Sequence, residues 1–252
     1  MDKNFGIEKN EVIVITGASG TMGKALIVKL LAGGIKVIAQ SRVLDKLNDL
    51  PKSPNLIKLV YDISNKETAK DFLPSIAKEH GKIKGLVMLA GFDKLMPIQL
   101  TSAASLQELL DVHAVVPYLL VGSLAKRDIA SENASVVLMS SLSTKGGAAG
   151  HTAYAMAKGA LGGFLMAAAS ELAPKKIRVN LLTPGVVQGE MSNAWINKLT
   201  DTQKEALLSS YPLGLGTGED IANSAYFLLS KESKWITGQE IILDGGHLCR
   251  RT

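Results

Sequence analysis

Seven short runs of β-branched and aliphatic residues recur along the chain and constrain its fold more than any other feature. They are EVIVITG, KVIAQ, LIKLVYD, GLVMLAG, SVVLMSS, IRVNLLTP and EIILDGG. Each run is apolar at nearly every position, whereas a strand with one face in water alternates apolar and polar residues. Helical stretches separate most of the runs, so helices cover both faces of a parallel sheet. The pattern predicts a doubly wound α/β fold.

We expect a single domain over residues 1–252. The chain is 46% apolar, and 252 residues suffice to bury one full core. No proline-rich, serine-rich or charge-rich linker and no internal repeat interrupts the alternation. The sequence therefore shows no position at which a boundary between two domains would be expected.

The cysteine count and the N-terminus bear on the compartment. Cys249 is the single cysteine, which excludes a disulfide within the chain, and it has no partner at metal-ligand spacing, so no metal site is expected. The first residues, MDKNFGIEKNE, are charged, and no apolar run is long enough to span a membrane. These features predict a cytoplasmic protein with no membrane partner.

The net charge of +5 raises the question of a polyanionic partner. The charge is diffuse, and the one compact basic cluster is Arg250 with Arg251. No basic stripe interleaved with aromatic residues occurs, so we expect no nucleic-acid partner.

A glycine-rich turn, TGASGTMG, follows the first apolar run and opens a helical stretch. Glycines allow a tight turn and close backbone approach to a pyrophosphate, which the helix N-terminus stabilises. This placement predicts a dinucleotide loop, with an ordinary flexible turn as the alternative. The expected contacts are Gly17, Ser19, Gly20, Thr21, Met22 and Gly23.

The ends of the second and third runs indicate which dinucleotide binds. An acidic residue after the second run would bind both ribose hydroxyls, but Ser41 and Arg42 stand there. Arg42 can pair with a 2′-phosphate, which favours NADP(H) over NAD(H); a solvated arginine is the alternative. Asp62, followed by Ile63, is a candidate to contact the adenine, with a helix N-cap as the alternative.

Three residue types that suit carbonyl chemistry occur in the second half of the chain. Tyr154 and Lys158 lie one helical turn apart, and Ser140 and Ser141 end the preceding run. Hydride addition to a carbonyl creates an alkoxide, which a phenol can protonate. A free tyrosine has a pKa of about 10, and a nearby ammonium with a positive nicotinamide ring would lower it. We therefore expect these side chains to converge at the carboxyl edge of the sheet.

The ordered motifs TGASGTMG, MLAG, MSS with YAMAK, RVNLLTPG and FLLSKESKWITGQEIILDGG resemble the short-chain dehydrogenase/reductase family over essentially the whole length. The resemblance implies a seven-stranded Rossmann sheet of order 3-2-1-4-5-6-7 and a reductase of the short single-domain branch, similar to 3-oxoacyl-[acyl-carrier-protein] reductases. It also implies that Ser141 is the catalytic serine, Tyr154 the acid/base, and Lys158 the ligand of the nicotinamide ribose. Further implied cofactor contacts are Ala90, Gly91, Pro184, Gly185 and Val187.

The usual fourth catalytic residue of the family, an asparagine, is replaced by His113. In the family, the backbone carbonyl at this position holds a water that connects the lysine to solvent. The residue four positions later is Pro117, which has no N–H to bond that carbonyl. Our hypothesis is that Pro117 leaves the His113 carbonyl free for this water; a histidine packed at an interface beside an incidental kink is the alternative.

Further departures concern the cofactor loop and its surroundings. Thr21 stands where the short branch has glycine, and the glycine spacing matches the sugar-nucleotide-modifying branch. Gly189 replaces a threonine that contacts the carboxamide in the family, so cofactor affinity is expected to rest on backbone contacts from Val187. Met88 and Leu89 replace asparagines, which we expect to cost a structural hydrogen bond.

Residues 186–213 lack strand character and are expected to close over the substrate as an amphipathic lid helix. Apolar residues in it favour a partly apolar carbonyl or alcohol substrate, with ordinary core packing as the alternative. His151 lies either at the pocket mouth or on a solvated loop. The apolar lid residues are Met191, Trp195, Ile196, Leu199 and Tyr211.

Small residues on the helix that carries Tyr154 would allow close contact with a second subunit, and the resemblance implies a homotetramer or dimer. Two other functions stay open: a dinucleotide-sensing regulator, which need not keep serine, tyrosine and lysine in register, and a sugar-nucleotide epimerase, which normally needs a larger C-terminal region. The small residues are Ala157, Gly159, Ala160, Gly162 and Gly163.

Overall fold

A computed structural model describes residues 6–9 and 11–249, so the Arg250–Arg251 cluster lies outside the described residues. Within them, parallel strands form one seven-stranded sheet in the order β3-β2-β1-β4-β5-β6-β7, which confirms the expected topology. The strands are β1 (Val12–Thr16), β2 (Lys36–Ser41), β3 (Leu56–Val60), β4 (Ile83–Met88), β5 (Ala130–Met139), β6 (Arg178–Pro184) and β7 (Glu240–Leu243).

The burial of the strands explains their continuous apolar sequence. Every residue of β1 is buried, as are all residues of β2 and β6 after the first in each strand. The edge strands β3 and β7 are only partly covered. Apolar side chains on both faces are therefore needed in the centre of the sheet, which is the arrangement of a doubly wound fold.

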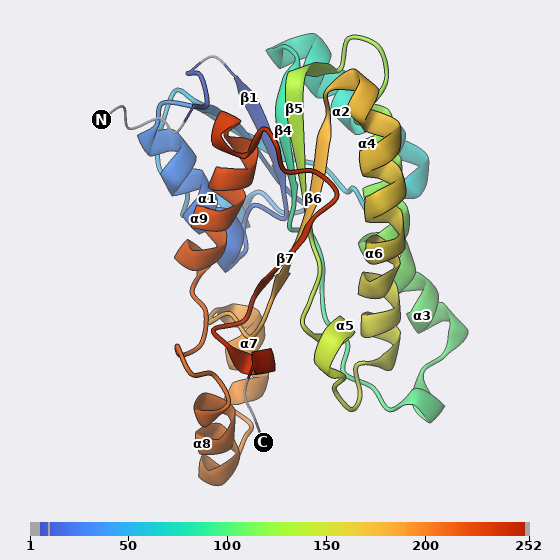
Figure 1. Cartoon of the computed structure of the whole chain (residues 1–252), viewed down its shortest axis with the longest axis vertical. Coiled ribbons are helices and arrows are strands. Elements are labelled where there is room, and N and C mark those ends of the chain that lie inside the picture. Colours follow the sequence, from blue (N-terminus) through green and yellow to red (C-terminus); the bar gives the residue numbers. More distant parts are fainter. Residues whose placement is uncertain (1–5, 10, 250–252) are drawn as a thin grey trace.

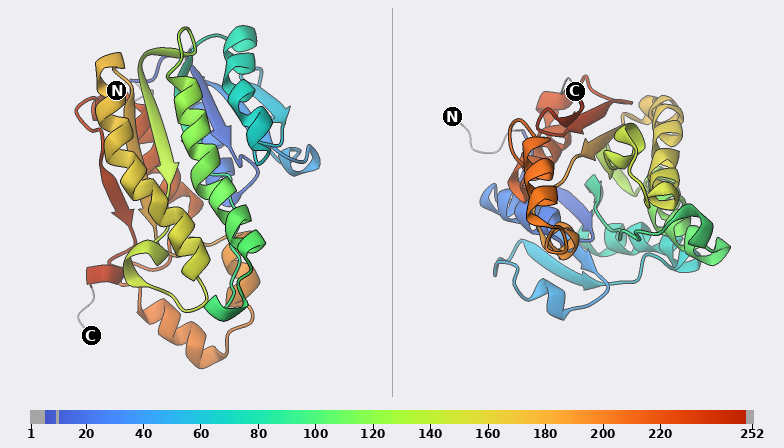
Figure 2. Two further views of the ribbon diagram at one scale, coloured as in Figure 1. Left: turned by 90° about the vertical axis from the view of Figure 1, so that its right-hand side faces the viewer. Right: turned by 90° about the horizontal axis from the view of Figure 1, so that it is seen from below.

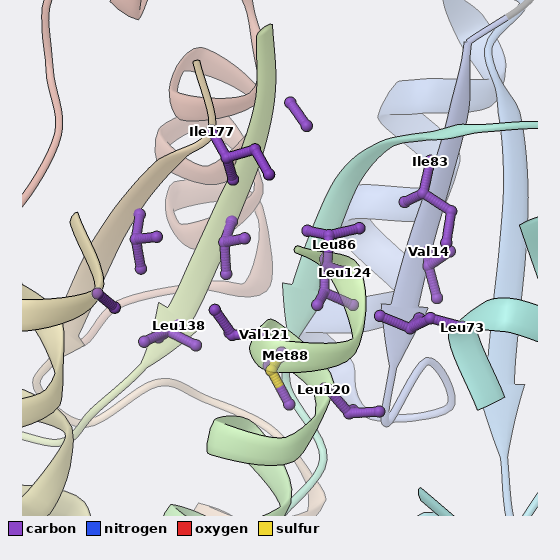
Figure 3. Packing of buried hydrophobic residues seen from close by; sticks show 14 of the residues in the cluster. Val14, Leu73, Ile83, Leu86, Met88, Leu120, Val121, Leu124, Leu138 and Ile177 are labelled. Atoms are coloured by element: carbon purple, nitrogen blue, oxygen red, sulfur yellow. The ribbon is translucent and has the colours of Figure 1, made fainter. Parts of the chain in front are cut away.

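Helices cover the two faces as separate layers (Figure 1). On one face lie α1 (Thr21–Ala32) and α9 (Gly218–Leu229), which pack against each other. On the other lie α2 (Lys66–His80), α4 (Val116–Leu124) and α6 (Thr152–Leu172). Figure 3 shows part of the core on this second side, with Leu120, Val121 and Leu124 of α4 facing Leu86 and Met88 of β4.

A continuous helix from Ala103 to Leu124 consists of α3 (Ala103–Leu110), a π-helical turn (Asp111–Val115) and α4. By length and composition it could cross a membrane. Leu120, Val121 and Leu124 are buried in the core, which accounts for the apolar character of its second half.

The segment expected as one lid helix forms two helices, α7 (Glu190–Ile196) and α8 (Asp201–Ser209). Both lie beyond the carboxyl ends of the strands, as does α5 (Ser143–Gly146) (Figures 1 and 2). Tyr211 follows α8 and is buried, so it is not part of a lid helix. Short 3-10 turns complete the described chain at Asp45–Leu47, Ile98–Leu100, Ala173–Lys175, Lys231–Ser233 and His247–Cys249.

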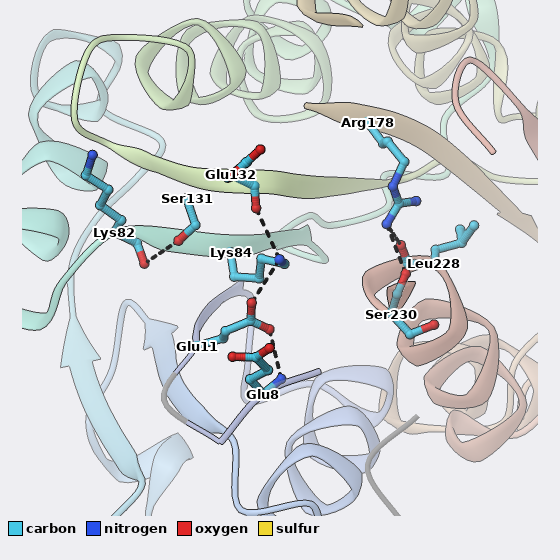
Figure 4. A network of polar contacts seen from close by, with 9 residues as sticks. All are labelled: Glu8, Glu11, Lys82, Lys84, Ser131, Glu132, Arg178, Leu228 and Ser230. Atoms are coloured by element: carbon cyan, nitrogen blue, oxygen red, sulfur yellow. Dashed lines mark hydrogen bonds and ion pairs between the residues drawn. The ribbon is translucent and has the colours of Figure 1, made fainter. Parts of the chain in front are cut away.

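Charged side chains tie the strands together at the amino edge of the sheet (Figure 4). Lys84 pairs with Glu11 at 2.8 Å and donates to the carbonyl of Glu132 at 3.1 Å. Arg178 donates to the carbonyls of Leu228 and Ser230, and burial lowers its pKa to about 10. These contacts fix the edge opposite to the predicted site, where no chemistry is expected.

Candidate active site

The glycine loop has the geometry expected of a dinucleotide turn. Gly17 has a φ of +64°, which favours glycine, and a Cβ on it would overlap the backbone of Ala90. A Cβ on Gly23 would overlap Ala18, so this glycine allows the helix to pack closely. Gly20 caps α1, and a Cβ on it would meet only the Gly17 carbonyl at 3.6 Å. The loop thus leaves open backbone at a helix N-terminus, which fits a pyrophosphate.

Gln40, on β2, holds this loop in place and was missed in the sequence. It is buried, and its side-chain oxygen accepts a hydrogen bond from the Gly17 N–H at 3.1 Å. Its own carbonyl accepts from the Ala18 N–H at 2.9 Å, and its amide donates to the Tyr61 carbonyl. A feature of the sequence could have indicated this residue, because Gln40 is a polar residue at the end of an apolar run.

The residues expected near the adenosine lie at the carboxyl ends of β2 and β3. Ser41 is buried, with its hydroxyl 3.4 Å from that of Ser19, while Arg42 is exposed. Asp62 accepts hydrogen bonds from the N–H and hydroxyl of Ser64 in a local turn, so it is not a helix N-cap. Asn65 caps α2 instead.

The serine, tyrosine and lysine expected to act together lie side by side. Ser141 follows the end of β5, and its side chain hydrogen-bonds Tyr154, which α6 carries beside it. Lys158 is buried one turn further along α6, with its Nζ 5.9 Å from the centre of the Tyr154 ring. Its ammonium donates to the Met139 carbonyl at 2.7 Å. The arrangement can deliver a proton to an oxygen bound between Ser141 and Tyr154.

The electrostatics differ from the sequence expectation at Tyr154. Burial raises the pKa of its phenol well above the usual value, and the charge of Asp93 raises it further, while the bond from Ser141 lowers it. Burial also lowers the pKa of Lys158 to about 8. In the protein alone, burial and the charge of Asp93 therefore keep the phenol protonated at neutral pH.

His113 lies in the π-helical turn, with its ring edge-on to Tyr154 at 5.2 Å between ring centres. It is buried, and its Nε2 lies 2.7 Å from the carbonyl of Phe92. Burial, together with the charge of Lys158, lowers its pKa to about 3, so the imidazole is neutral and Nε2–H donates this bond. A Cβ on Gly91 would overlap the imidazole, which explains the glycine there.

A small cavity lies behind Lys158. Its volume is about 10 Å³, and its lining includes His113, Pro117, Lys158 and Ile63. The π-helical turn ends at Val115, two residues before Pro117, and the N–H of Val116 after it bonds the Asp111 carbonyl. Regular α-helical bonding is thus interrupted where a proline cannot donate to His113.

The other expected cofactor residues also follow strand ends. Ala90 donates its N–H to the Thr16 hydroxyl at 3.4 Å, and Gly185 donates to the Leu243 carbonyl at 2.9 Å. Val187 forms a parallel bridge with Gly216 that uses the carbonyl of Val186 and the N–H of Gln188. The N–H and the carbonyl oxygen of Val187 itself take no part in this bridge.

His151 does not lie on a solvated loop. Its Nε2 lies 2.9 Å from Oδ2 of Asp93, and its ring contacts Tyr154 edge-on at 6.1 Å. Sequence reasoning missed Asp93, because nothing local distinguishes it from other acidic residues on a loop. The two are partners only through the packing of two distant segments.

Comparison with known proteins places this geometry in a family. A family model described as enoyl-(acyl carrier protein) reductase matches residues 17–247. The chain belongs to the short-chain dehydrogenase/reductase family. It is 32% identical to an uncharacterized oxidoreductase, YmfI, of Bacillus subtilis over 95% of this chain and 100% of the relative. It is also 30% identical to the 3-oxoacyl-[acyl-carrier-protein] reductase FabG of Chlamydia pneumoniae, over 93% of this chain and 95% of the relative.

A solved structure has the same fold over nearly the whole length. A short-chain dehydrogenase/reductase described as glucose/ribitol dehydrogenase from Brucella melitensis superposes with a TM-score of 0.88 at 26% identity. The match covers 98% of this chain and 99% of that chain. As a short-chain dehydrogenase/reductase, the protein is an NAD(P)-dependent oxidoreductase.

One departure from the short-chain dehydrogenase/reductase pattern involves two residues in contact. Thr21 opens α1 beside the glycine loop, and Gly189 caps α7. A Cβ on Gly189 would overlap the side chain of Thr21. Thr21 therefore fits beside position 189 because that residue is a glycine.

Proposed function

We propose that the protein is an NADP(H)-dependent reductase that converts the ketone of a 3-oxoacyl thioester, or a related ketone, into a secondary alcohol. The observation that carries the proposal is the contact of Ser141, Tyr154 and Lys158 at the carboxyl edge of the sheet. The likeness to 3-oxoacyl-[acyl-carrier-protein] reductases supports the substrate class.

Tyr154 is the proton donor in this proposal. When bound, a reduced nicotinamide supplies the hydride that the carbonyl carbon receives. The substrate oxygen then takes a proton from the Tyr154 hydroxyl, while the Ser141 hydroxyl donates a hydrogen bond to the same oxygen. Because burial and Asp93 raise the pKa of Tyr154, the phenol is protonated at neutral pH, as reduction requires.

Lys158 and His113 support this proton transfer. Lys158 is positively charged below about pH 8, and with its ammonium near Tyr154 it stabilises the phenolate that remains after donation. The neutral imidazole of His113 is no proton carrier near pH 7. The cavity of about 10 Å³ between His113, Pro117 and Lys158 is close to the smallest that holds a water. We place the relay water there, on the His113 carbonyl.

The preference for NADP(H) rests on Arg42. Its guanidinium is exposed beside Ser41, at the end of β2, where a 2′-phosphate would lie. A carboxylate at this position would repel the phosphate, whereas the guanidinium can form two parallel hydrogen bonds with it.

We also propose a cytoplasmic homo-oligomer. Tyr118, Met156 and Met166 are exposed apolar residues on α4 and α6, and Gly159 and Gly163 leave the α6 surface open. Such a face suits close contact with a second helix pair. Ala157 is buried in the core, so it does not belong to this face.

A substrate panel tests the proposed activity. We expect NADPH oxidation with 3-oxoacyl thioesters and simple ketones, and a loss of about a hundredfold or more in kcat for Tyr154→Phe. Full activity of the Tyr154→Phe protein would contradict the assignment of the proton donor. Absence of turnover on every ketone would contradict the function itself.

A further inference from the structure

We propose that Ser143 is a positioning residue, whose N–H and hydroxyl together occupy both lone pairs of the Ser141 hydroxyl oxygen. Ser141 can then only donate a hydrogen bond, toward Tyr154 in the protein alone and toward the reacting oxygen during reduction. This role rests on the proposed function, since it sets the direction of the hydrogen bonds that the reduction uses.

A short turn after β5 brings the two serines together. The N–H of Ser143 donates to Oγ of Ser141 at 3.3 Å, and the hydroxyl of Ser143 donates to the same atom at 3.1 Å. Leu142 lies between them in the chain, is buried, and donates its N–H to the Pro184 carbonyl at 2.9 Å. The carbonyl of Ser141 accepts the N–H of Thr144 at 3.1 Å. These bonds hold Ser143 in place beside the Ser141 hydroxyl.

The bonding capacity of a hydroxyl decides what Ser141 does. A serine hydroxyl has one O–H to donate and two lone pairs that accept. Ser143 supplies a donor to each lone pair, so the bond between Ser141 and Tyr154 uses the Ser141 O–H. The effect on Tyr154 agrees with this direction, because the bond lowers the pKa of the phenol, as a donor to the phenolate oxygen does.

This direction prepares the site for reduction. Tyr154 does not donate its proton to Ser141, whose lone pairs are filled, so the Tyr154 O–H stays available for the substrate oxygen. The Ser141 O–H donates to the same oxygen as negative charge develops on it. A hydroxyl that accepts hydrogen bonds is polarised by them, which strengthens the bond that it donates. Ser143 therefore acts on the reacting oxygen through Ser141.

Replacing Ser143 tests this role by kinetics. Ser143→Ala removes the donor to one lone pair and keeps the N–H, so Tyr154 donates to Ser141 in part of the molecules. We expect kcat/KM for NADPH-dependent reduction of ethyl 3-oxobutanoate to fall about fivefold, because the productive arrangement is less populated. Ser143→Thr keeps the hydroxyl and should recover most of the loss. An unchanged kcat/KM in Ser143→Ala overturns the proposal.

A double-mutant cycle separates this role from a structural one. In a Ser141→Ala background, the hydroxyl on which Ser143 acts is absent. Ser143→Ala should therefore cause no further loss of kcat/KM there, so the coupling between the two serines equals the whole effect of Ser143→Ala. An equal loss in both backgrounds would assign the effect to the turn and refute the positioning role.

Thr144→Val is the matched control. The Thr144 hydroxyl donates to the Ser141 carbonyl at 2.8 Å, so this substitution removes one hydrogen bond from the same turn and leaves the Ser141 hydroxyl untouched. The N–H of Thr144 still bonds that carbonyl. We expect kcat/KM to stay nearly unchanged. A loss as large as that of Ser143→Ala would show that any weakening of the turn suffices, which contradicts a specific role for Ser143.

A spectroscopic test needs neither cofactor nor substrate, so it separates the role of Ser143 from the proposed function. The chain has five tyrosines, and ¹³C labelling of their Cζ atoms gives one signal each, of which Tyr154→Phe identifies that of Tyr154. In Ser143→Ala we expect this signal to move toward the phenolate position, since donation to Ser141 weakens the Tyr154 O–H bond. It should stay in place in Thr144→Val.

The outcomes of this measurement are distinct. An unmoved Tyr154 signal in Ser143→Ala overturns the role of Ser143 whatever the turnover. A moved signal in a protein that reduces no ketone supports this role and contradicts the proposed function alone.

Discussion

The side chain of Thr21 occupies the space in which a side chain on Gly189 would lie. One residue opens α1 and the other caps α7, so the contact joins the dinucleotide loop to the first of the two helices beyond the strand ends. The size of the side chain at position 21 therefore limits which residues fit at position 189, and the reverse also holds.

The first prediction follows from this contact. Gly189→Thr alone should lower stability by about 1–3 kcal/mol through overpacking, and it should weaken NADPH binding because α7 or the loop must shift. Adding Thr21→Gly frees the space and should restore both properties. Thermal unfolding and fluorescence titration with NADPH measure the two effects. Additive losses in the double variant would show that the residues are not coupled.

The second prediction concerns the role of Arg42 in the preference for NADPH. Arg42→Ala should raise the Kd for NADPH about tenfold and leave the Kd for NADH nearly unchanged, because only the 2′-phosphate contact is lost. Lys46→Ala is the matched control, since Lys46 is an exposed cation on the turn after β2. A wide preference of the wild-type protein for NADH would contradict the inference.

The third prediction concerns pH. Burial lowers the pKa of Lys158 to about 8, so its positive charge is present below this pH and is lost as the pH rises through it. When Lys158 loses this charge, it no longer stabilises the Tyr154 phenolate. We therefore expect kcat/KM for NADPH-dependent reduction to fall on the alkaline side. A pH profile of kcat/KM measures this. Lys158→Met should be slow throughout and show no such fall near pH 8.

The fourth prediction tests the helix beside His113. Pro117→Ala supplies an N–H that can bond the His113 carbonyl, which should remove the π-helical turn and displace a water held there. We expect a lower kcat with a larger solvent isotope effect, because proton delivery to Tyr154 slows. Unchanged kinetics together with an unchanged isotope effect would favour the view that His113 only packs against Tyr154 and Gly91.

Packing alone can be separated from chemistry at His113. His113→Gln retains a side-chain amide that can donate to the Phe92 carbonyl from the position of Nε2, whereas His113→Ala leaves that carbonyl without this bond. A stability loss confined to His113→Ala, with kcat preserved in His113→Gln, is the result expected if the backbone carbonyl carries the proton relay.

The sequence determined the sheet, its order and the class of enzyme. Continuous apolar runs such as VIVIT and a glycine turn after the first strand are local patterns, and the i, i+4 spacing fixes Tyr154 and Lys158 on one helix face. The motifs were distinctive enough in order and spacing to identify the family.

The tertiary structure decided what depends on partners far apart in the chain. It paired Asp93 with His151, set Thr21 against Gly189 and showed that Gln40 holds the glycine loop. It also raised the Tyr154 pKa in the protein alone, because burial depends on how completely neighbouring segments cover the phenol. Spacing along a helix or strand follows from the sequence, whereas contacts and desolvation follow only from the packed chain.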